Sequence, residues 1–336
     1  MRRLPLAAQA DLTGDPPGGF GFAIGNDEQY RPVQAVGDQR VEISGADGAG
    51  LLMCHVSRPL DRRPRGDGPL LVVVHGALRD SDRYLAHTRQ AARLSRSDPL
   101  IVAPQFLADV DARAAAGVPD DALYWEVEGW KGGYPAVGSS AVSSFSAMDG
   151  LLDQLTAGLS GGRDPAVVMF GNSAGGQFVN RYAAVGRGPD LLAGRGLAVR
   201  FIISNPSTYL YFDRERPVAV RDSATVNRWR YGFDHAPRYV DTGPRQSLER
   251  YLARDVTIVL GALDNDRASR LLEVSPPAMA QGANRLDRGR RYHRHVRALA
   301  SAAGRPTRHR LIQLTGVGHA AGDVLAAAQI REVIFG

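Results

Sequence analysis

Short apolar runs alternate with segments of helical periodicity along most of this chain, and that alternation restricts its fold more than any other feature. The first unit has an apolar run at 70–74, a helical pattern at 84–94 and a second apolar run at 100–103. Such runs are typical of buried parallel strands joined by crossover helices. Further strands are expected at 166–170, 199–204, 256–260 and 310–314, and further helices at 143–155, 174–185, 290–303 and 324–334. The sequence therefore predicts an α/β fold, with a mostly parallel sheet covered by helices on both faces.

The organisation of the chain favours one large domain. Its 336 residues, 44% of them hydrophobic, suffice for a single core. Segments 41–44 and 51–57 flank a Gly-Ala-Asp-Gly turn and predict an antiparallel hairpin at a sheet edge. Two stretches exceed the usual connections of about 2–6 residues. The expected parts are an irregular arm at 1–40 and a domain at 41–336, with insertions at about 105–140 and 205–250.

The segment Gly171-Asn172-Ser173-Ala174-Gly175-Gly176 directly follows an apolar strand and opens a helical pattern. A turn this tight between strand and helix requires residues without bulk at 171 and 175. It lifts the Ser173 hydroxyl above the end of the strand, near a helix N-terminus. The alternative is a glycine-rich turn in which the serine only caps the helix. The context favours a nucleophile elbow, with Ser173 as the nucleophile.

A serine hydroxyl needs a neighbouring base to take its proton. Of the eight histidines, His319 lies in a glycine-bounded loop directly after the last predicted strand. Chain order supports it as the base, because nucleophile, acid and histidine follow one another in this order in folds of this kind. The acid that orients the imidazole should follow the preceding strand, where the sequence offers Asp264 and, as the alternate, Asp266.

An oxyanion hole requires backbone N–H groups aimed at the carbonyl oxygen of the substrate. Ala174, directly after the serine, supplies one donor. The other is expected in the loop after the 70–74 strand, from Ala77, with Leu78 as an alternative. His75 in that loop is expected to be a structural support and not the base.

Four segments, in their order along the chain, resemble the motifs of the α/β-hydrolase superfamily: His75-Gly76, Gly171-Asn172-Ser173-Ala174-Gly175, Gly261-Ala262-Leu263-Asp264 and Gly316-Val317-Gly318-His319. The likeness covers about residues 40–336. The elbow and the segment after Ala103 are similar to bacterial esterases of the polyhydroxybutyrate-depolymerase and feruloyl-esterase kind. The resemblance implies an α/β-hydrolase fold with loop or cap insertions, and a serine esterase that acts on a small-molecule ester through an acyl-enzyme, without a cofactor or metal. Cleavage of an amide or peptide by the same triad stays open, as does a non-catalytic ligand-binding protein of this fold.

Aromatic residues concentrate in the two insertions. They include Trp125, Trp130, Tyr134 and Tyr209. Two interpretations carry equal weight: the rings are walls of a substrate pocket, or they pin the loops to the core.

The charge pattern argues against a nucleic-acid partner. A net charge of +6 comes from 41 basic and 35 acidic residues, yet Lys131 is the only lysine. The excess of arginine is therefore interpreted as compositional bias and not as a binding surface. Basic residues between 288 and 297 are expected on a solvated helix face. His293 and His295 would point to different sides of that helix, so no metal site is expected.

No apolar stretch reaches the roughly 18 residues that span a bilayer, so no membrane insertion is expected. Residues 1–10, with an Arg pair and an Ala8-Gln9-Ala10 ending, imitate a cleavable leader. Their apolar part is shorter than the roughly 7–15 residues that such a leader requires. We expect a cytoplasmic protein, with export as the alternative. The sequence leaves a homo-oligomer open.

Overall fold

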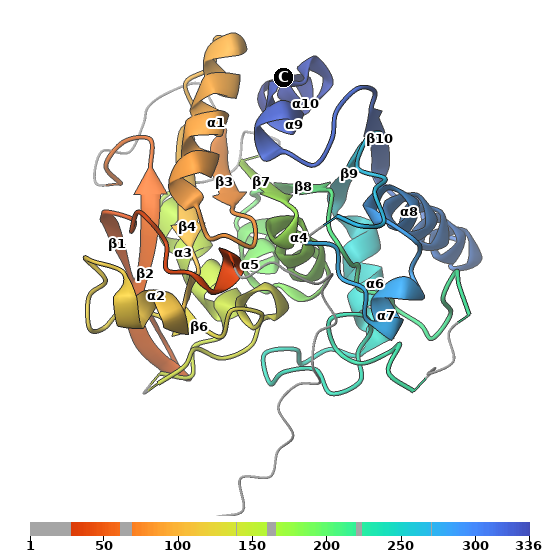
Figure 1. Cartoon of the computed structure of the whole chain (residues 1–336), viewed down its shortest axis with the longest axis horizontal. Helices are drawn as coiled ribbons and strands as arrows, with labels where there is room; N and C mark the ends of the chain where they lie inside the picture. The colour runs from red at the N-terminus through yellow and green to blue at the C-terminus, as the bar shows by residue number, and fades with distance from the viewer. Residues whose placement is uncertain (1–27, 61–68, 139, 160–165, 220–223, 270) are drawn as a thin grey trace, which may run out of the picture.

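The fold is built around one eight-stranded sheet (Figure 1). The computed structural model describes residues 28–60, 69–138, 140–159, 166–219, 224–269 and 271–336; the leader-like segment 1–10 and most of the predicted arm lie outside them. The strand order is β1-β2-β4-β3-β7-β8-β9-β10. The strands are β1 Gln39–Gly45, β2 Gly48–Val56, β3 Leu70–Val74, β4 Leu100–Gln105, β7 Val167–Asn172, β8 Val199–Ser204, β9 Asp255–Gly261 and β10 Arg310–Leu314.

The strand directions agree with the sequence prediction. β1 and β2 form the expected antiparallel edge hairpin, with Gly45 opposite Gly48 at its turn, and β2 runs antiparallel to β4. The other neighbouring strands pair in parallel. Because parallel neighbours end at the same edge of the sheet, the loops after β3, β7, β8, β9 and β10 meet there.

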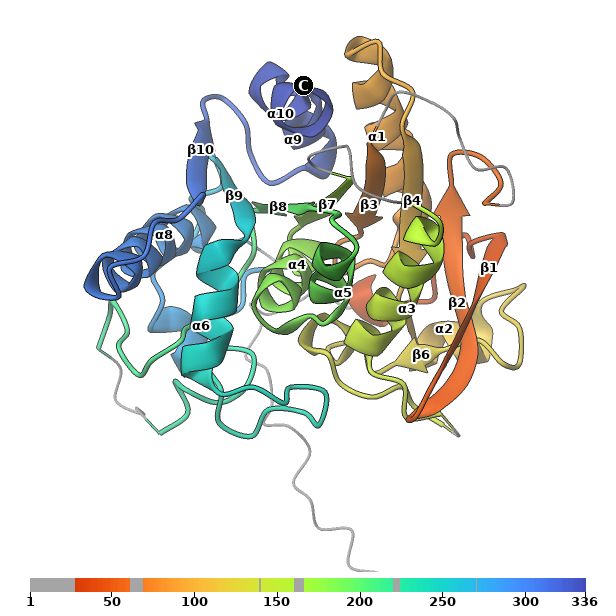
Figure 2. The ribbon, with the colours of Figure 1, turned by 180° about the vertical axis from the view of Figure 1, so that it is seen from behind.

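Helices cover both faces of the sheet, as Figures 1 and 2 show. On β3, Leu71 and Val73 point to a core shared with one group of helices, while Val72 and Val74 point to the core on the other side. The first group is α1 Ser81–Leu94, α9 Ala321–Ala326 and α10 Ala328–Phe335. The second is α3 Ser144–Thr156, α4 Ala174–Val185, α5 Gly188–Gly194, α6 Pro244–Ala253 and α8 Arg285–Ala302. Among the described residues, no helix has both the length and the apolar character needed to cross a membrane.

The prediction of a single terminal helix over 324–334 is wrong. Ala327 has ψ 130°, an extended conformation that ends α9 and starts α10. The predicted insertions also contain regular structure that their weak periodicity concealed. The first holds β5 Leu107–Ala108, α2 Asp109–Ala114, β6 Tyr124–Trp125 and a 3₁₀ turn, η2, at Trp130–Gly132, and the second ends in α6.

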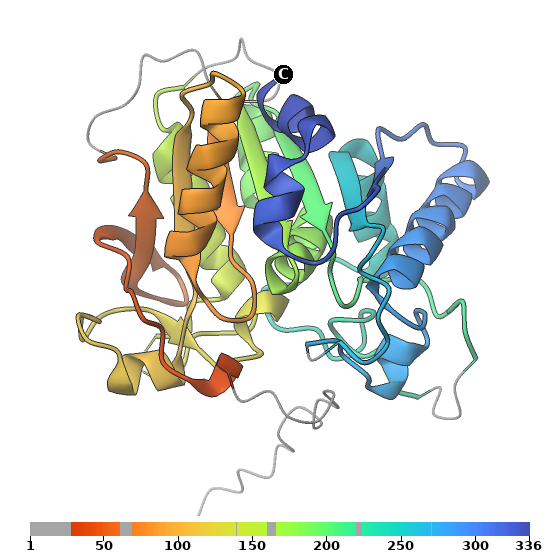
Figure 3. The same cartoon turned by 45° about the horizontal axis from the view of Figure 1, so that its top comes forward.

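A buried ion pair connects the segment around Gln29 and Val33 to the sheet. Arg79 follows β3, and its Nε lies 2.5 Å from Oδ2 of Asp111 in α2, with both side chains fully buried. Asp111 also accepts hydrogen bonds from the backbone N–H groups of Val33 and Ala108. Arg79 donates to the carbonyl oxygen of Gln29. Figure 3 shows this early segment, in red, beside α2.

Two aspartates in the first turn of α2 allow the ion pair to be tested. Asp111→Asn should lower the free energy of unfolding by about 3–5 kcal/mol, because it leaves the buried Arg79 guanidinium without a counter-charge. Asp109 pairs with Arg113 at the surface, where the Arg113 side chain is 71% exposed, so Asp109→Asn should cost under about 1 kcal/mol. Urea unfolding of both variants measures the difference, and equal losses would contradict the role given to Asp111.

Candidate active site

The strand-to-helix turn at Ser173 has the geometry that its sequence predicts. β7 ends at Asn172, α4 begins at Ala174, and Ser173 between them has φ 59° and ψ −120°. This is a strained conformation for a residue with a side chain. The glycines are required by close approach: a Cβ on Gly171 would lie 2.3 Å from the carbonyl oxygen of Gly175, and one on Gly175 would lie 2.2 Å from that of Val74.

The loops after β9 and β10 bring an acid and a histidine to the same edge of the sheet. Nδ1 of His319 lies 2.7 Å from Oδ2 of Asp264. Asn172, the residue before Ser173, donates a hydrogen bond from its side-chain amide to the carbonyl oxygen of His319 at 3.0 Å. The histidine loop is thus tied directly to the serine turn. Asp266 is exposed and accepts from the backbone N–H of Ala268, so the hydrogen bond to His319 favours Asp264 as the acid.

A buried arginine holds the acid from the other side. Nη1 of Arg285, at the start of α8, lies 3.3 Å from Oδ1 of Asp264. Burial alone would raise the pKa of Asp264, but the hydrogen bond with His319 and the charges of His319 and Arg285 outweigh it and lower the pKa. Burial lowers the pKa of His319 below 6.5; the hydrogen bond to Asp264 opposes this shift, and the charge of Arg285 adds to it. The imidazole is therefore neutral near pH 7 and can accept a proton.

His75 supports the loop that carries the second expected oxyanion donor. The backbone N–H of Phe106 donates to Nε2 of His75, so the proton of the ring is on Nδ1, which donates to the carbonyl oxygen of Gly76. Burial lowers the pKa of His75 to about 4, which keeps the ring neutral. A histidine with both nitrogens engaged in this way fixes the backbone beside Ala77.

A small pocket opens next to the serine. Its wall contains Ser173 together with Ala77 and Ala174, the two expected oxyanion donors. The amide of Ala174 is at the first position of α4 and has no acceptor within the helix. The rest of the wall is Gln29, Lys131, Gln177, Ser207, Leu271 and Glu273.

The aromatic residues expected as substrate contacts lie mainly in the core. Trp125, Trp130 and Tyr209 have no exposed surface and are absent from the pocket wall, and half-buried Tyr134 packs against the same core. Trp130 stacks on Phe106 with the ring centroids 5.4 Å apart. The placement of the three buried rings favours the interpretation in which they pin loops to the core.

The charged residues of the site are what sequence reasoning missed. Lys131 and Glu273 are 3% and 2% exposed and line the pocket. The prediction that Arg288 lies on a solvated helix face is wrong, because it is fully buried and donates to the carbonyl oxygens of Ser207 and Glu273. The one available signal was that Lys131 is the only lysine in the chain.

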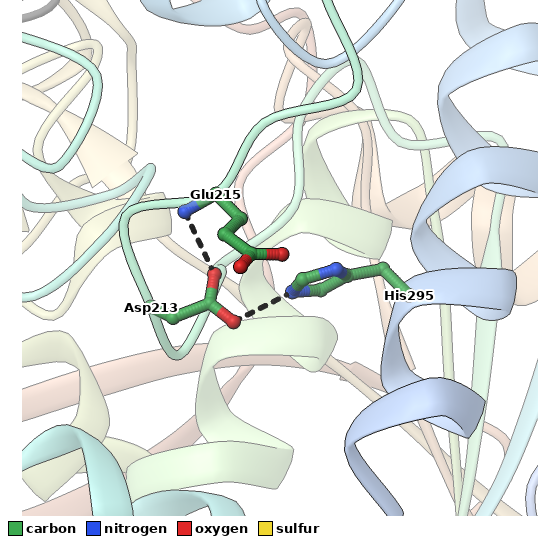
Figure 4. Close-up of side chains that lie close together, drawn as sticks. All are labelled: Asp213, Glu215 and His295. Atoms are coloured by element: carbon green, nitrogen blue, oxygen red, sulfur yellow. Dashed lines mark hydrogen bonds and ion pairs between the residues drawn. The ribbon is translucent and has the colours of Figure 1, made fainter. Parts of the chain in front are cut away.

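A second group of titratable side chains lies between the loop after β8 and α8 (Figure 4). Asp213, Glu215 and His295 have potential ligand atoms within 4.8 Å of one another and could hold a metal ion. Nε2 of His295 lies 3.1 Å from Oδ2 of Asp213, and this contact lowers the pKa of Asp213 against the opposing effect of burial. The contact of His295 with Asp213 and the hydrogen bond from the backbone N–H of Glu215 to Oδ1 of Asp213 account for their closeness without a metal, and the Glu215 side chain is exposed.

The strand order, the antiparallel edge hairpin and a serine turn after a central strand define an α/β-hydrolase fold, and this chain has that fold. Poly(aspartic acid) hydrolase-1 from Sphingomonas sp. KT-1 is similar, with 20% identity and a TM-score of 0.62 over 90% of this chain and 99% of that one. Poly(3-hydroxybutyrate) depolymerase from Bordetella parapertussis is also similar, with 24% identity and a TM-score of 0.58 over 87% of this chain and 88% of that one. Neither a protein-family model nor a curated protein matches the sequence.

The contact between Arg285 and Asp264 predicts how His319 titrates. NMR of histidine-labelled protein should give His319 a pKa below 6.5. Arg285→Met should raise that pKa, because it removes a positive charge that disfavours the imidazolium. Arg290→Met, an exposed arginine on the same helix, is the matched control and should leave the pKa unchanged. A His319 pKa that does not respond to Arg285→Met would contradict the electrostatic role of this arginine.

Proposed function

We propose that this protein is a serine hydrolase that cleaves carboxylic esters. Ser173 attacks the ester carbonyl, His319 takes the hydroxyl proton and gives it to the leaving alcohol, and Asp264 holds the imidazole and stabilises its charged form. The observation that carries the proposal is the hydrogen bond between Asp264 and His319. The loop of His319 is in turn hydrogen-bonded to Asn172, the residue before the strained Ser173.

The second half of the reaction uses the same groups. Water, activated by His319, attacks the acyl-enzyme and releases the acid and free Ser173. In both steps the N–H groups of Ala77 and Ala174 are the proposed donors to the oxyanion. Their position on the pocket wall beside Ser173 supports this role.

A non-catalytic protein of this fold would have no need of the strain at Ser173. A non-glycine residue at φ 59° and ψ −120°, outside the left-handed helical region, costs on the order of 1–3 kcal/mol, and such strain clusters at functional sites. The conformation therefore favours catalysis over a scaffold. The two similar structures named above are hydrolases of a polyamide and a polyester; their likeness concerns the fold, and the proposal rests on the side chains.

Removing the nucleophile tests the proposal. Ser173→Ala should lower kcat for p-nitrophenyl butyrate by about 10⁴-fold or more, because without the hydroxyl no proton passes to His319 and no acyl-enzyme forms. Ser301→Ala, at an exposed position of α8, is the control and should keep full activity. Unchanged turnover by a folded Ser173→Ala protein would rule out Ser173 as the nucleophile.

The leaving group is tested with substrates that share one acyl group. The wild-type protein should hydrolyse p-nitrophenyl butyrate faster than the matching p-nitroanilide, because an alkoxide or phenolate leaves more readily than an amide nitrogen. Release of the chromophore measures both rates. A higher kcat/KM for the anilide would replace the esterase assignment with an amidase.

A further inference from the structure

The side chain of Gln177 extends along α4 toward Ser173. Gln177 lies four residues after the serine, and its backbone N–H donates to the carbonyl oxygen of Ser173 at 3.0 Å. Residues four apart share one face of a helix, and their side chains lean toward the helix N-terminus. Both residues are part of the pocket wall. The Gln177 amide therefore lies on the same side of α4 as the nucleophile, in the wall of the same pocket.

Contacts with two side chains fix the orientation of this amide. Oε1 of Gln177 accepts hydrogen bonds from Nη2 of Arg181 at 3.2 Å and from the hydroxyl of Thr208 at 2.9 Å. A guanidinium has N–H donors and no acceptor, so the oxygen of the amide and not its nitrogen faces Arg181. Arg181 is itself held by the carbonyl oxygens of Lys131 and Arg230. The NH₂ group of Gln177 therefore points away from these partners.

That NH₂ group has no acceptor within the described part of the chain, although Gln177 is only 4% exposed. Leaving a buried donor unpaired is destabilising, so an unpaired donor beside a nucleophile indicates that a ligand supplies its acceptor. An acceptor atom in the pocket would complete the hydrogen bonding of the amide.

A second glutamine of the pocket wall, Gln29, comes from η1 Glu28–Tyr30. Its carbonyl oxygen accepts a hydrogen bond from Arg79, but among the described residues no hydrogen bond fixes its side-chain amide. Of these two glutamines, Gln177 is the one whose donor end is oriented before a substrate binds.

The pocket suits a single acceptor atom. It has room for about one water molecule, a space that one carbonyl oxygen also fits. Its charged members already have partners, because Lys131 contacts Glu128. Oε1 of Glu273 accepts hydrogen bonds from Tyr231 and Ser275. The space is too small for an acyl chain and matches the oxygen of the reacting carbonyl group.

We propose that the side-chain amide of Gln177 is a third oxyanion donor, which acts together with the backbone N–H groups of Ala77 and Ala174. The inference rests on the proposed ester hydrolysis and adds a catalytic residue to it. As Ser173 attacks, the carbonyl π electrons move to the oxygen, which gains negative charge beside the donors of the pocket wall. Because the amide is already oriented, no reorganisation is needed at that moment. The positive charge of Arg181 at the amide oxygen polarises the group and strengthens its N–H donors.

The test compares p-nitrophenyl butyrate with its thiono analogue, in which sulfur replaces the carbonyl oxygen. Sulfur accepts hydrogen bonds weakly, so an oxyanion donor favours the oxygen ester selectively. Gln177→Met should lower kcat for the oxygen ester by about 10²-fold with little change in KM, because the contact forms in the transition state. It should also lower the oxygen-to-sulfur ratio of kcat/KM by about 10-fold or more. Release of p-nitrophenolate measures both esters, with enzyme in excess where turnover is slow.

Two further variants guard the interpretation. Gln90→Met, at an exposed position of α1, is the matched control and should leave kcat and the ratio unchanged. Should Gln177→Met fail to fold because Arg181 and Thr208 lose their acceptor, Gln177→Glu keeps an acceptor for both and removes the donor. Its charge disfavours both esters alike, so the fall in the ratio is again the expected result.

The outcomes separate the two proposals. If the wild-type protein hydrolyses neither ester, or keeps its activity in Ser173→Ala, the proposed function itself fails. If Gln177→Met keeps its kcat, or loses activity toward both esters with an unchanged ratio, Gln177 is not an oxyanion donor. Either of these last two results overturns the inference and leaves ester hydrolysis standing.

Discussion

The close approach of α4 to the end of the sheet is the constraint on which the rest of the site depends. Gly175 lies against the carbonyl oxygen of Val74 with no room for a Cβ, and Gly171 lies against Gly175. This contact forces the strained conformation of Ser173 and aims the start of α4 at the pocket. It also places Gln177 on the pocket wall and lets Arg181, one turn further along α4, donate to the Lys131 backbone. The elbow therefore sets the position of Ser173 and of the pocket wall beside it.

Buried charges flank this elbow on two sides. Asp264 is held between His319 and Arg285, so its carboxylate is ionised, has a fixed orientation and contacts two partners. On the other side, Lys131 is paired with Glu128, which also contacts Arg230. In a low-dielectric interior such charges act strongly on neighbouring groups, because water does not screen them. We infer that the first arrangement supports the chemical step.

Local pattern was sufficient to predict the mostly parallel sheet, the edge hairpin and the turn at Ser173, because each depends on neighbours in the sequence. His319 and Asp264 were found through chain order. Trp130 could not be assigned, because an aromatic residue in a loop carries no sign of whether it faces core or pocket. Arg288 was misplaced for the same reason: α8 is rich in basic residues all round, and only its packing against the sheet decides which arginine is buried. Arg285 acts through Asp264, a partner distant in the sequence, which no local pattern shows.

Covalent labelling with a fluorophosphonate tests the central claim most directly, since the reagent reacts with a serine only when a base activates it. Mass spectrometry of the digested protein should find one adduct, on the peptide that contains Ser173. Labelling should slow as the pH falls through the pKa of His319, which lies below 6.5. An unlabelled but folded protein, or an adduct on another residue, would contradict the account of this site.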